Sequence, residues 1–207
     1  MAAPVPSVLR RFQRLAPARF RVADNKCSRR CVNTPGAGQD PKEGESEWTL
    51  DPSASSVEFH VKHFWGVMTV HGHFVSVTGD GKVASDGTAS GEIRIAAESV
   101  NTKNKQRDKH LRSDDFFDAA SHPTITISAA GLTPSGGTEL RGPITLSAAG
   151  HQQAVDTVVQ VVSAAAGGVT LRAEATVDRT AFDMTWSPLN MTRPEARAVV
   201  TARFVRN

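Results

Sequence analysis

The sequence predicts an all-β domain, an eight-stranded antiparallel barrel with one short helix, preceded by a disordered basic tail. Roughly eight segments alternate apolar and polar residues, which is the pattern of half-buried strands. Gly, Asp and Pro residues separate these segments at short intervals, and a single segment has a helical composition. The antiparallel barrel is the preferred interpretation of this pattern, and a β-sandwich is the alternative.

The first expected strand shows the alternation most clearly. Within residues 56–63, Val57, Phe59 and Val61 fall on one face of a strand, and polar residues fall on the other. The remaining strands are expected at 67–77, around Ile93 and Ile95, around Ile125 and Ile127, and at 140–146, 154–162, 169–177 and 196–205.

Turn signals separate these strands. Four pairs of the Asp-Gly or Gly-Gly type predict turns, namely Asp80-Gly81, Asp86-Gly87, Gly136-Gly137 and Gly167-Gly168. Pro143 predicts an edge, a bulge or an irregularity within 140–146, because proline cannot donate to a strand ladder. The segment with helical composition is 101–112, which lies between two strands.

Length and composition allow one domain with a core. The 207 residues are 39% hydrophobic and 22% charged, which suits one domain of about 150–200 residues plus a tail. We expect residues 47–207 to form the barrel and residues 1–46 to form a basic disordered extension and linker. No apolar run approaches the ~18 residues of a membrane span, so no transmembrane segment is expected.

The basic charge is concentrated in residues 1–39. They hold eight Arg and Lys residues and one acid, Asp24, whereas the remainder holds 16 basic and 20 acidic residues. The folded part is therefore acidic, and we expect no nucleic acid among its partners. The tail fits a disordered extension, an organelle transit peptide, or a weak contact with an anionic surface or nucleic acid. Because it lacks the apolar stretch of a secretory signal, a cytoplasmic location is expected.

The sequence lacks the motifs of several common classes of catalytic and metal site. The two cysteines, Cys27 and Cys31, are too few for a four-thiolate zinc site, and both lie outside the expected barrel. The sequence contains no Gly-x-Ser-x-Gly, no phosphate-binding Gly-Lys-Ser/Thr loop and no HExxH. It also contains no tyrosine. A common hydrolase, nucleotide-binding or zinc-protease site is therefore not expected.

Four blocks between residues 48 and 128 resemble one bacterial family, in the same order and with the same spacing. They are Trp48–Phe59, Lys62–Phe74, Ser99–Asp118 and His122–Ile125. On these blocks the chain resembles the YceI-like proteins. Asp178–Phe182 further resembles the family's Arg-x-x-Phe-Gly element, with Asp183 in the place of the usual glycine.

The resemblance implies an eight-stranded antiparallel lipocalin-like barrel with a long apolar tunnel. It further implies non-enzymatic binding, transport or sequestration of a polyisoprenoid, such as an isoprenoid quinone, or of a related amphiphilic lipid. The expected partners are this lipid and a second copy of the chain in a homodimer. No cofactor besides the bound lipid is expected, and no metal.

The candidate ligand site combines strand residues with aromatic residues at strand ends. The alternation places eight apolar side chains in a lumen, where they line a tunnel or fill a solid core: Phe59, Val61, Ile93, Ile95, Ile125, Ile127, Ile144 and Leu146. Phe74 belongs to the same site. Four more aromatics either rim the tunnel mouth or cap the barrel: Phe64, Trp65, Phe116 and Phe117. The head-group candidates are His63, Arg107 and Arg112.

Two rival functions stay open at this point. The first is an enzyme that acts on a lipid or quinone through His63 with Arg107 or Asp108. The second is a metal site on His71 and His73, which share a strand face, with a third ligand from elsewhere. The charged run 106–112 also fits local pairing that pins the helical segment over one end of the barrel.

Overall fold

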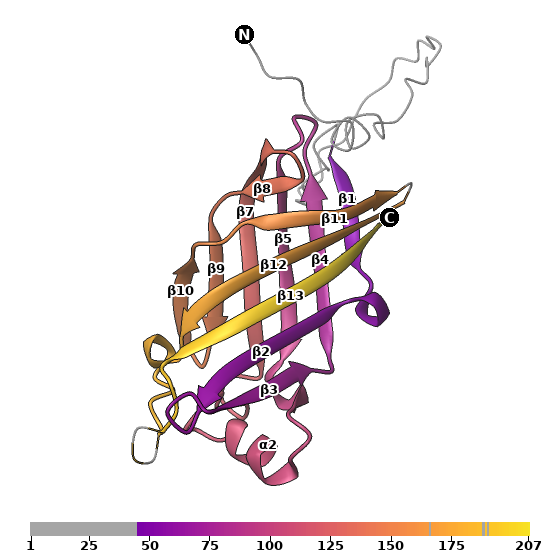
Figure 1. The fold of residues 1–207 in the computed structure, drawn as a ribbon. Helices are drawn as coiled ribbons and strands as arrows, with labels where there is room; N and C mark the ends of the chain where they lie inside the picture. The colour runs from indigo at the N-terminus through magenta and orange to yellow at the C-terminus, as the bar shows by residue number, and fades with distance from the viewer. Residues whose placement is uncertain (1–44, 166, 188, 190) are drawn as a thin grey trace, which may run out of the picture.

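The computed structural model of the chain describes residues 45–207, except 166, 188 and 190. The predictions for the basic extension, including Cys27 and Cys31, lie outside the described residues. Within the described ranges, one antiparallel sheet of 13 strand segments closes on itself (Figure 1). Its segments are β1 Ser46–Leu50, β2 Ser56–His63, β3 Met68–Phe74, β4 Val77–Val83, β5 Ala89–Ala96, β6 Val100–Asn101, β7 Thr124–Gly136, β8 Glu139–Arg141, β9 Ile144–Ala148, β10 His151–Val155, β11 Val159–Ala165, β12 Gly168–Asp178 and β13 Glu195–Arg206.

The 13 segments make eight barrel strands, because several strands are broken in two. One circuit runs through β1, β4, β5, β7, β8, β11, β12 and β13 and returns to β1. The 3-10 turn η1 (Pro52–Ala54) separates β1 from β2, which pair with β4 and β3 respectively. In the same way η2 (Ala97–Ser99) separates β5 from β6. The predicted eight-stranded antiparallel barrel is therefore confirmed.

The last strand closes the barrel. β13 pairs with β12 along eleven residues on one side, from Gly168↔Val205 to Asp178↔Glu195. On its other side it pairs first with β2 and then with β1, where Trp48 lies opposite Arg206. Closure satisfies backbone groups that an open sheet would leave at its edges.

Turn chemistry explains most of the strand breaks. Pro143 lies between β8 and β9, where the sequence predicts an irregularity. The turn predicted at Asp80-Gly81 is wrong, because both residues lie inside β4 and Gly81 pairs with Gly91 of β5. A Cβ atom on Gly81 would lie 3.3 Å from the backbone carbonyl oxygen of Ser90, so this glycine lets β4 and β5 lie close together.

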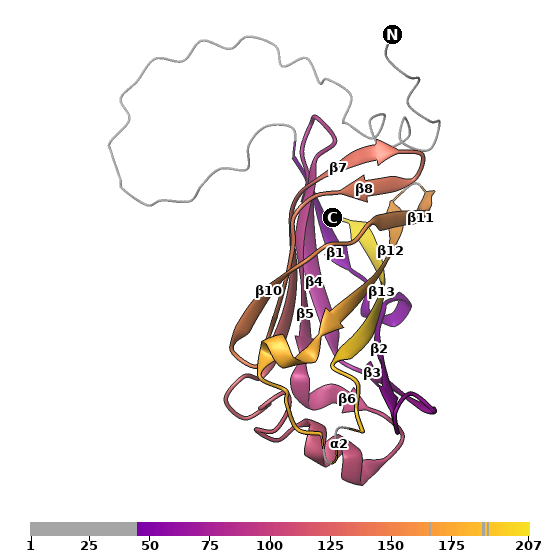
Figure 2. The same ribbon diagram turned by 60° about the vertical axis from the view of Figure 1, so that its left-hand side comes forward.

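The α-helix of the described residues, α2 (Lys105–Leu111), covers one end of the barrel (Figures 1 and 2). It is shorter than the predicted 101–112, because Asn101 pairs with β3 as part of β6. Asn104 begins the helix, since its side chain accepts hydrogen bonds from the backbone N–H groups of Gln106 and Arg107, both at 3.1 Å. The β7–β8 hairpin lies at the opposite end (Figure 2). None of the helices described is long and apolar enough to cross a bilayer.

Candidate functional site

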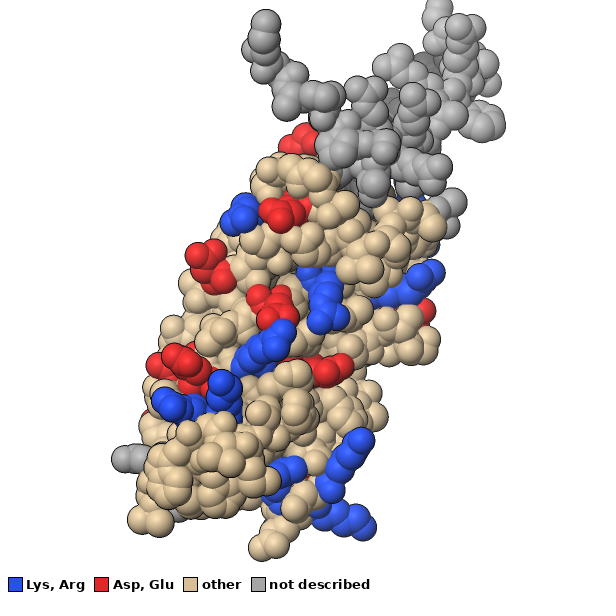
Figure 3. Space-filling view, in the orientation of Figure 1, with Lys and Arg blue, Asp and Glu red and all other residues tan. Residues whose placement is uncertain are grey.

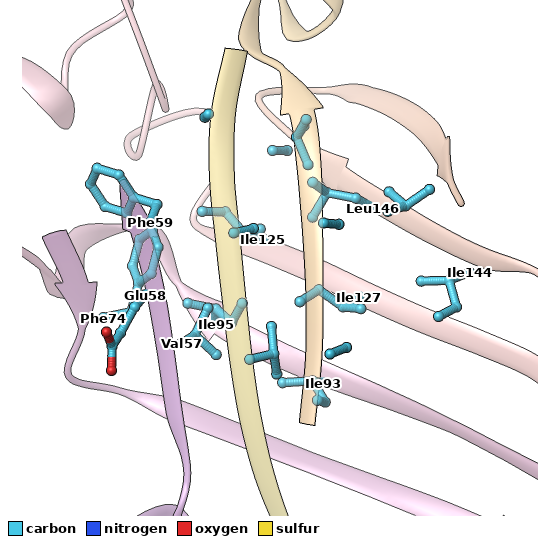
Figure 4. A pocket seen from close by; sticks show the side chains of 18 of the residues that line it. Val57, Glu58, Phe59, Phe74, Ile93, Ile95, Ile125, Ile127, Ile144 and Leu146 are labelled. Carbon is cyan, nitrogen blue, oxygen red and sulfur yellow. The ribbon is translucent and has the colours of Figure 1, made fainter. Parts of the chain in front are cut away.

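The barrel encloses a cavity of about 780 Å³. One wall is rich in isoleucine, because alternate residues of neighbouring strands point inward from the same register positions. Ile93 of β5 lies opposite Ile127 of β7, and Ile127 lies opposite Leu146 of β9. Figure 4 shows these side chains around one common space, together with Phe59 and Phe74 from the other side. The wall is therefore a continuous aliphatic surface.

The opposite wall explains why the barrel is hollow. Its inward positions on β12 and β13 include many alanines among larger apolar residues, as in Leu171, Ala173 and Ala175. An eight-stranded barrel is just wide enough for its own side chains to fill the interior. The short alanine side chains leave part of that interior empty. The alanines that line the cavity are Ala89, Ala129, Ala148, Ala173, Ala175, Ala196, Ala198 and Ala202.

A glycine makes further room at the α2 end. Gly72 of β3 lies directly opposite Phe59 of β2, and a Cβ atom on Gly72 would lie 2.2 Å from Cζ of Phe59. The Phe59 ring therefore lies flat over the backbone of β3. It packs with Phe74 and Phe117, at centroid distances of 5.7 and 6.3 Å. This aromatic cluster joins the wall of the cavity to the loop that follows α2.

Polar side chains line the cavity at the α2 end. His63 Nδ1 lies 2.7 Å from Thr192 Oγ1. His110 Nε2 lies 2.8 Å from the Asp115 carboxylate, and the His110 ring packs edge-on against Trp186 at 4.4 Å. His63, His110, Thr192 and Trp186 all line the cavity. A guest that is apolar along its length and polar at one end therefore finds both kinds of surface here.

Arg179 is a buried cation in the lining of the cavity. Its guanidinium donates to the carbonyl of Arg193 at 3.1 Å, to that of Trp186 at 3.2 Å, and to that of Met184. Burial lowers the pKa of Arg179, and the nearby Asp178 carboxylate acts in the opposite direction. Asp178 in turn accepts hydrogen bonds from the N–H and hydroxyl of Thr180 and so begins the turn η3 (Arg179–Phe182). Arg179 thus holds the loop that carries Trp186 over the cavity.

Arg107 and Asp108 are engaged with Thr102. The Arg107 guanidinium donates to the Thr102 hydroxyl at 2.7 Å and to its carbonyl at 2.9 Å. The buried Asp108 carboxylate accepts from the Thr102 N–H at 2.8 Å and from its hydroxyl at 2.5 Å. These bonds fix α2 to the strand end before it. The charged run thus pins the helix, as the sequence suggested, but through bonds to Thr102 and not through ion pairs among its own charges.

Most of the predicted site residues lie around one cavity. Those that line it are Phe59, Val61, His63, Phe74, Ile93, Ile95, Arg107, Phe116, Phe117, Ile125, Ile127, Ile144 and Leu146. Of the two interpretations offered for the apolar residues, lining a hollow therefore fits the geometry better than filling a solid core. Whether they contact a ligand stays a prediction.

Three predicted residues lie outside the cavity lining. Phe64 and Trp65 form the tip of the β2–β3 hairpin, where both backbones have positive φ and both side chains point to solvent. Arg112 donates to the carbonyl of Glu98 at 2.7 Å and to that of Val100 at 3.0 Å. It therefore ties the end of α2 to η2 and β6. A rim role for the two aromatics and a head-group role for Arg112 stay predictions.

The residues of the two rival sites are only partly brought together. Asp108 is bonded to Thr102 and does not line the cavity, whereas His63 and Arg107 both line it. His71 packs against His60 across the β2–β3 pair, at 4.5 Å between ring centroids. Among residues 45–207, with their three gaps, no group of three or more His, Cys, Asp or Glu residues is placed to hold a metal ion.

Sequence reasoning missed several lining residues. Arg179 was noted as part of a family element without a role, and Trp186 was not singled out. The inward faces of β12 and β13 were also missed, although Val169–Val177 alternates clearly. Assigning faces along these two strands, as was done for β2, would have found Leu171 and Phe204.

Comparison with known proteins places the chain in a family. The model of the YceI-like domain matches residues 48–204. A UPF0312 protein of Staphylococcus aureus strain MRSA252 is 32% identical over 120 residues, which cover 57% of this chain and 68% of that protein.

Solved structures show the same fold. Burkholderia cenocepacia BcnA aligns with a TM-score of 0.68 and 19% identity, over 74% of this chain and 98% of that chain. A polyisoprenoid binding domain from Saccharophagus degradans aligns with a TM-score of 0.64 and 19% identity, over 77% of this chain and 98% of that chain. The family predicted from the four sequence blocks is thus confirmed by a match that spans nearly the whole barrel. The chain belongs to the YceI-like family.

Proposed function

We propose that the barrel binds one long, mostly apolar amphiphile and carries or sequesters it without chemical change. The observation that carries this proposal is the cavity of about 780 Å³, which is aliphatic along its walls and polar at the α2 end. Its volume lies within the range of about 300–1,000 Å³ that is common for ligand sites. A polyisoprenoid or isoprenoid-quinone-like lipid has the matching form, a long hydrocarbon chain with one polar end.

Apolar burial supplies enough free energy for such binding. Removing ~400 Å² of a chain from water at about 25 cal/mol per Å² gives on the order of 10 kcal/mol. Immobilisation of the chain and loss of overall motion subtract several kcal/mol, which leaves roughly micromolar to nanomolar affinity. No catalytic group is needed for this result.

The fold relatives support the ligand class. The domain from Saccharophagus degradans that shares this fold is described as polyisoprenoid binding. In this chain the head group of such a ligand would lie at the α2 end, near His63 and Arg107. A non-enzymatic role also agrees with the engagement of Asp108 and Arg107 by Thr102.

Native mass spectrometry of the purified full chain tests the proposal. We expect an adduct with the mass of an isoprenoid-like lipid, and binding of added polyprenyl probes. The variant Ala173→Phe places a ring in the hollow and should abolish both, while its thermal unfolding stays cooperative. The matched variant Thr170→Phe changes an outward position of the same strand and should bind normally. A chain that carries no adduct and binds no polyprenyl probe would contradict the proposal.

Two further predictions accompany this function. We propose a cytoplasmic location, which cell fractionation tests. We also propose that two copies pair as a homodimer, which sedimentation equilibrium of the full chain tests.

A further inference from the structure

The tip of the β2–β3 hairpin exposes large apolar side chains. Val67 is 85% exposed, Trp65 is 65% exposed, Met68 is 57% exposed and Phe64 is 41% exposed. Two views show this end of the β2–β3 ribbon projecting from the barrel (Figures 1 and 2). A contiguous exposed apolar group of this kind marks an interaction site more often than scattered single residues do.

A second segment adds to the same surface. The Trp65 N–H donates to the carbonyl of Met191 at 3.3 Å, and the Arg193 N–H donates to the carbonyl of Lys62 at 2.9 Å. The loop before β13 therefore lies against the hairpin. It carries Leu189, which is 81% exposed. We call the combined surface the hairpin patch, made of Phe64, Trp65, Val67, Met68 and Leu189.

The backbone holds the hairpin patch outward at a cost. Phe64 and Trp65 have φ angles of 50° and 53°, a region that bulky residues rarely adopt. The tip is nonetheless fixed by hydrogen bonds from the Gly66 N–H to the His63 carbonyl and from the Val67 N–H to the Phe64 carbonyl, at 3.2 and 3.1 Å. Exposed rings do not repay such strain by burial within the chain. A strained turn that presents exposed rings is a reason to look for a partner outside the chain.

Basic residues accompany the apolar tip. Lys62 and Arg193 flank the hairpin patch, and both are exposed. Lys103, Lys105 and Lys109 are exposed on and beside α2 at the same end. Among the described residues, none of these five forms an ion pair. Figure 3 shows Lys and Arg over this end, and no acidic side chain there on the face in view.

The hairpin patch also adjoins the opening of the cavity. His63 lines the cavity and directly precedes Phe64, and its ring contacts that of Phe64 at 4.5 Å. Asn104 and Gln106 are exposed and line the cavity too, so the cavity reaches the surface at the α2 end. A lipid that leaves or enters here passes next to the exposed aromatics.

We propose that the α2 end docks on an anionic lipid bilayer, with the hairpin patch inserted in the interface. Tryptophan and other aromatics favour the boundary between headgroups and acyl chains, and Lys and Arg favour an anionic surface. A projecting apolar tip flanked by Lys62 and Arg193 fits a soft, negatively charged surface better than it fits a flat protein interface. The inference concerns the outside of the barrel, so it does not depend on which guest the cavity holds.

Quenching of tryptophan fluorescence by vesicles with brominated acyl chains tests the proposal. The full chain is mixed with vesicles of phosphatidylglycerol and phosphatidylcholine in equal parts, or of phosphatidylcholine alone. The basic tail has no tryptophan, so quenching reports insertion of the folded part and not attachment through the tail. Trp186 is 42% exposed at the same end, so the measurement uses a Trp186→Phe background. We expect quenching by the anionic vesicles, and Trp65→Phe in that background should remove most of it. Trp48 is buried and serves as the silent reference.

Matched variants separate the apolar and basic contributions. Trp65→Ser with Val67→Ser should lower partitioning about tenfold or more, whereas Val162→Ser, at a position 61% exposed on β11, should not change it. Lys62→Gln and Arg193→Gln should each lower partitioning on anionic vesicles about fivefold. Lys82→Gln, at the opposite end of the barrel, is their control.

Three outcomes would overturn the proposal. The first is vesicle binding without indole quenching, which would assign binding to the tail. The second is equal partitioning of wild type and the Trp65→Ser, Val67→Ser variant. The third is a wild-type dimer in sedimentation equilibrium that becomes monomeric in this variant, which would make the patch an interface between copies. The cavity-filling Ala173→Phe variant should dock on vesicles like wild type. A failure of the docking proposal can therefore be told apart from a failure of the lipid-binding proposal.

Discussion

The cavity wall and the α2 end are built by different means. The wall is made of strands whose inward positions repeat every second residue, and its side chains are aliphatic from Ile93 to Leu146. The α2 end is made of a short helix and loops that are joined by side-chain bonds to backbone carbonyls, as at Arg179 and Arg112. The wall thus offers a uniform apolar surface, whereas the α2 end offers specific polar groups and depends on individual contacts.

The largest effect on the α2 end is expected from Arg179→Ala. This change leaves the carbonyls of Met184, Trp186 and Arg193 without their buried donor, and we expect a loss of about 3 kcal/mol in the free energy of unfolding. Urea unfolding measures it. Arg179→Lys keeps a charge but not the planar fork, so it should lose nearly as much. An unchanged urea midpoint in both variants would show that the loop that carries Trp186 is stable without the Arg179 hydrogen bonds.

Phe117 connects the two regions, and its removal should cost nearly as much. Its ring packs edge-on against Phe74 at 5.6 Å and against Phe59 at 6.3 Å. We expect Phe117→Ala to destabilise the fold by about 3 kcal/mol, and Phe117→Leu by about 1 kcal/mol, because leucine refills part of the space. Chemical unfolding of both variants gives the comparison. If the alanine variant is as stable as wild type, the cluster does not couple the wall to the α2 end.

A pair of valines measures the difference between a packed and a hollow interior. Val100 is fully buried and does not line the cavity, whereas Val61 lines it. Val100→Ala should cost about 2 kcal/mol, since it removes buried methyl groups and leaves a new void. Val61→Ala should cost about half as much, since its side chain already faces empty space. Equal losses in urea unfolding would mean that the cavity is collapsed in solution.

The cavity wall could be predicted from the sequence more fully than the α2 end. Strand alternation identified Ile125 and Ile127 as inward residues, because their polar neighbours must face water. The alanine positions of β12 and β13 alternate with polar residues too, but alanine is acceptable on either face, so the pattern does not show that they leave a hollow. The hollow they leave was therefore reached through family resemblance and not through pattern.

At the α2 end, pattern alone is weaker still. Trp186 meets His110, which is far away in the sequence, and its carbonyl accepts a hydrogen bond from Arg179 within the same loop. Trp65 shows the same limit, because a hairpin tip obeys local turn geometry, which strand alternation does not describe. Alternation describes one strand at a time, whereas these contacts depend on how separate segments meet.

The smallest effect concerns acid. Hydrogen bonds from the hydroxyl and the N–H of Thr180 lower the pKa of Asp178, which begins η3 ahead of Arg179. Because the folded pKa lies below the unfolded value of about 3.9, the stabilisation is complete above that value and is lost as the pH falls through the folded pKa. We expect the urea midpoint to fall on acidification from about pH 6 to about pH 3, and to fall slightly less in Asp178→Asn. Ile127 and the other aliphatic residues of the cavity wall do not titrate, so acid should weaken the η3 turn while leaving the aliphatic contacts intact. If the urea midpoint has the same pH dependence in wild type and in Asp178→Asn, this carboxylate does not contribute to the stability of the α2 end.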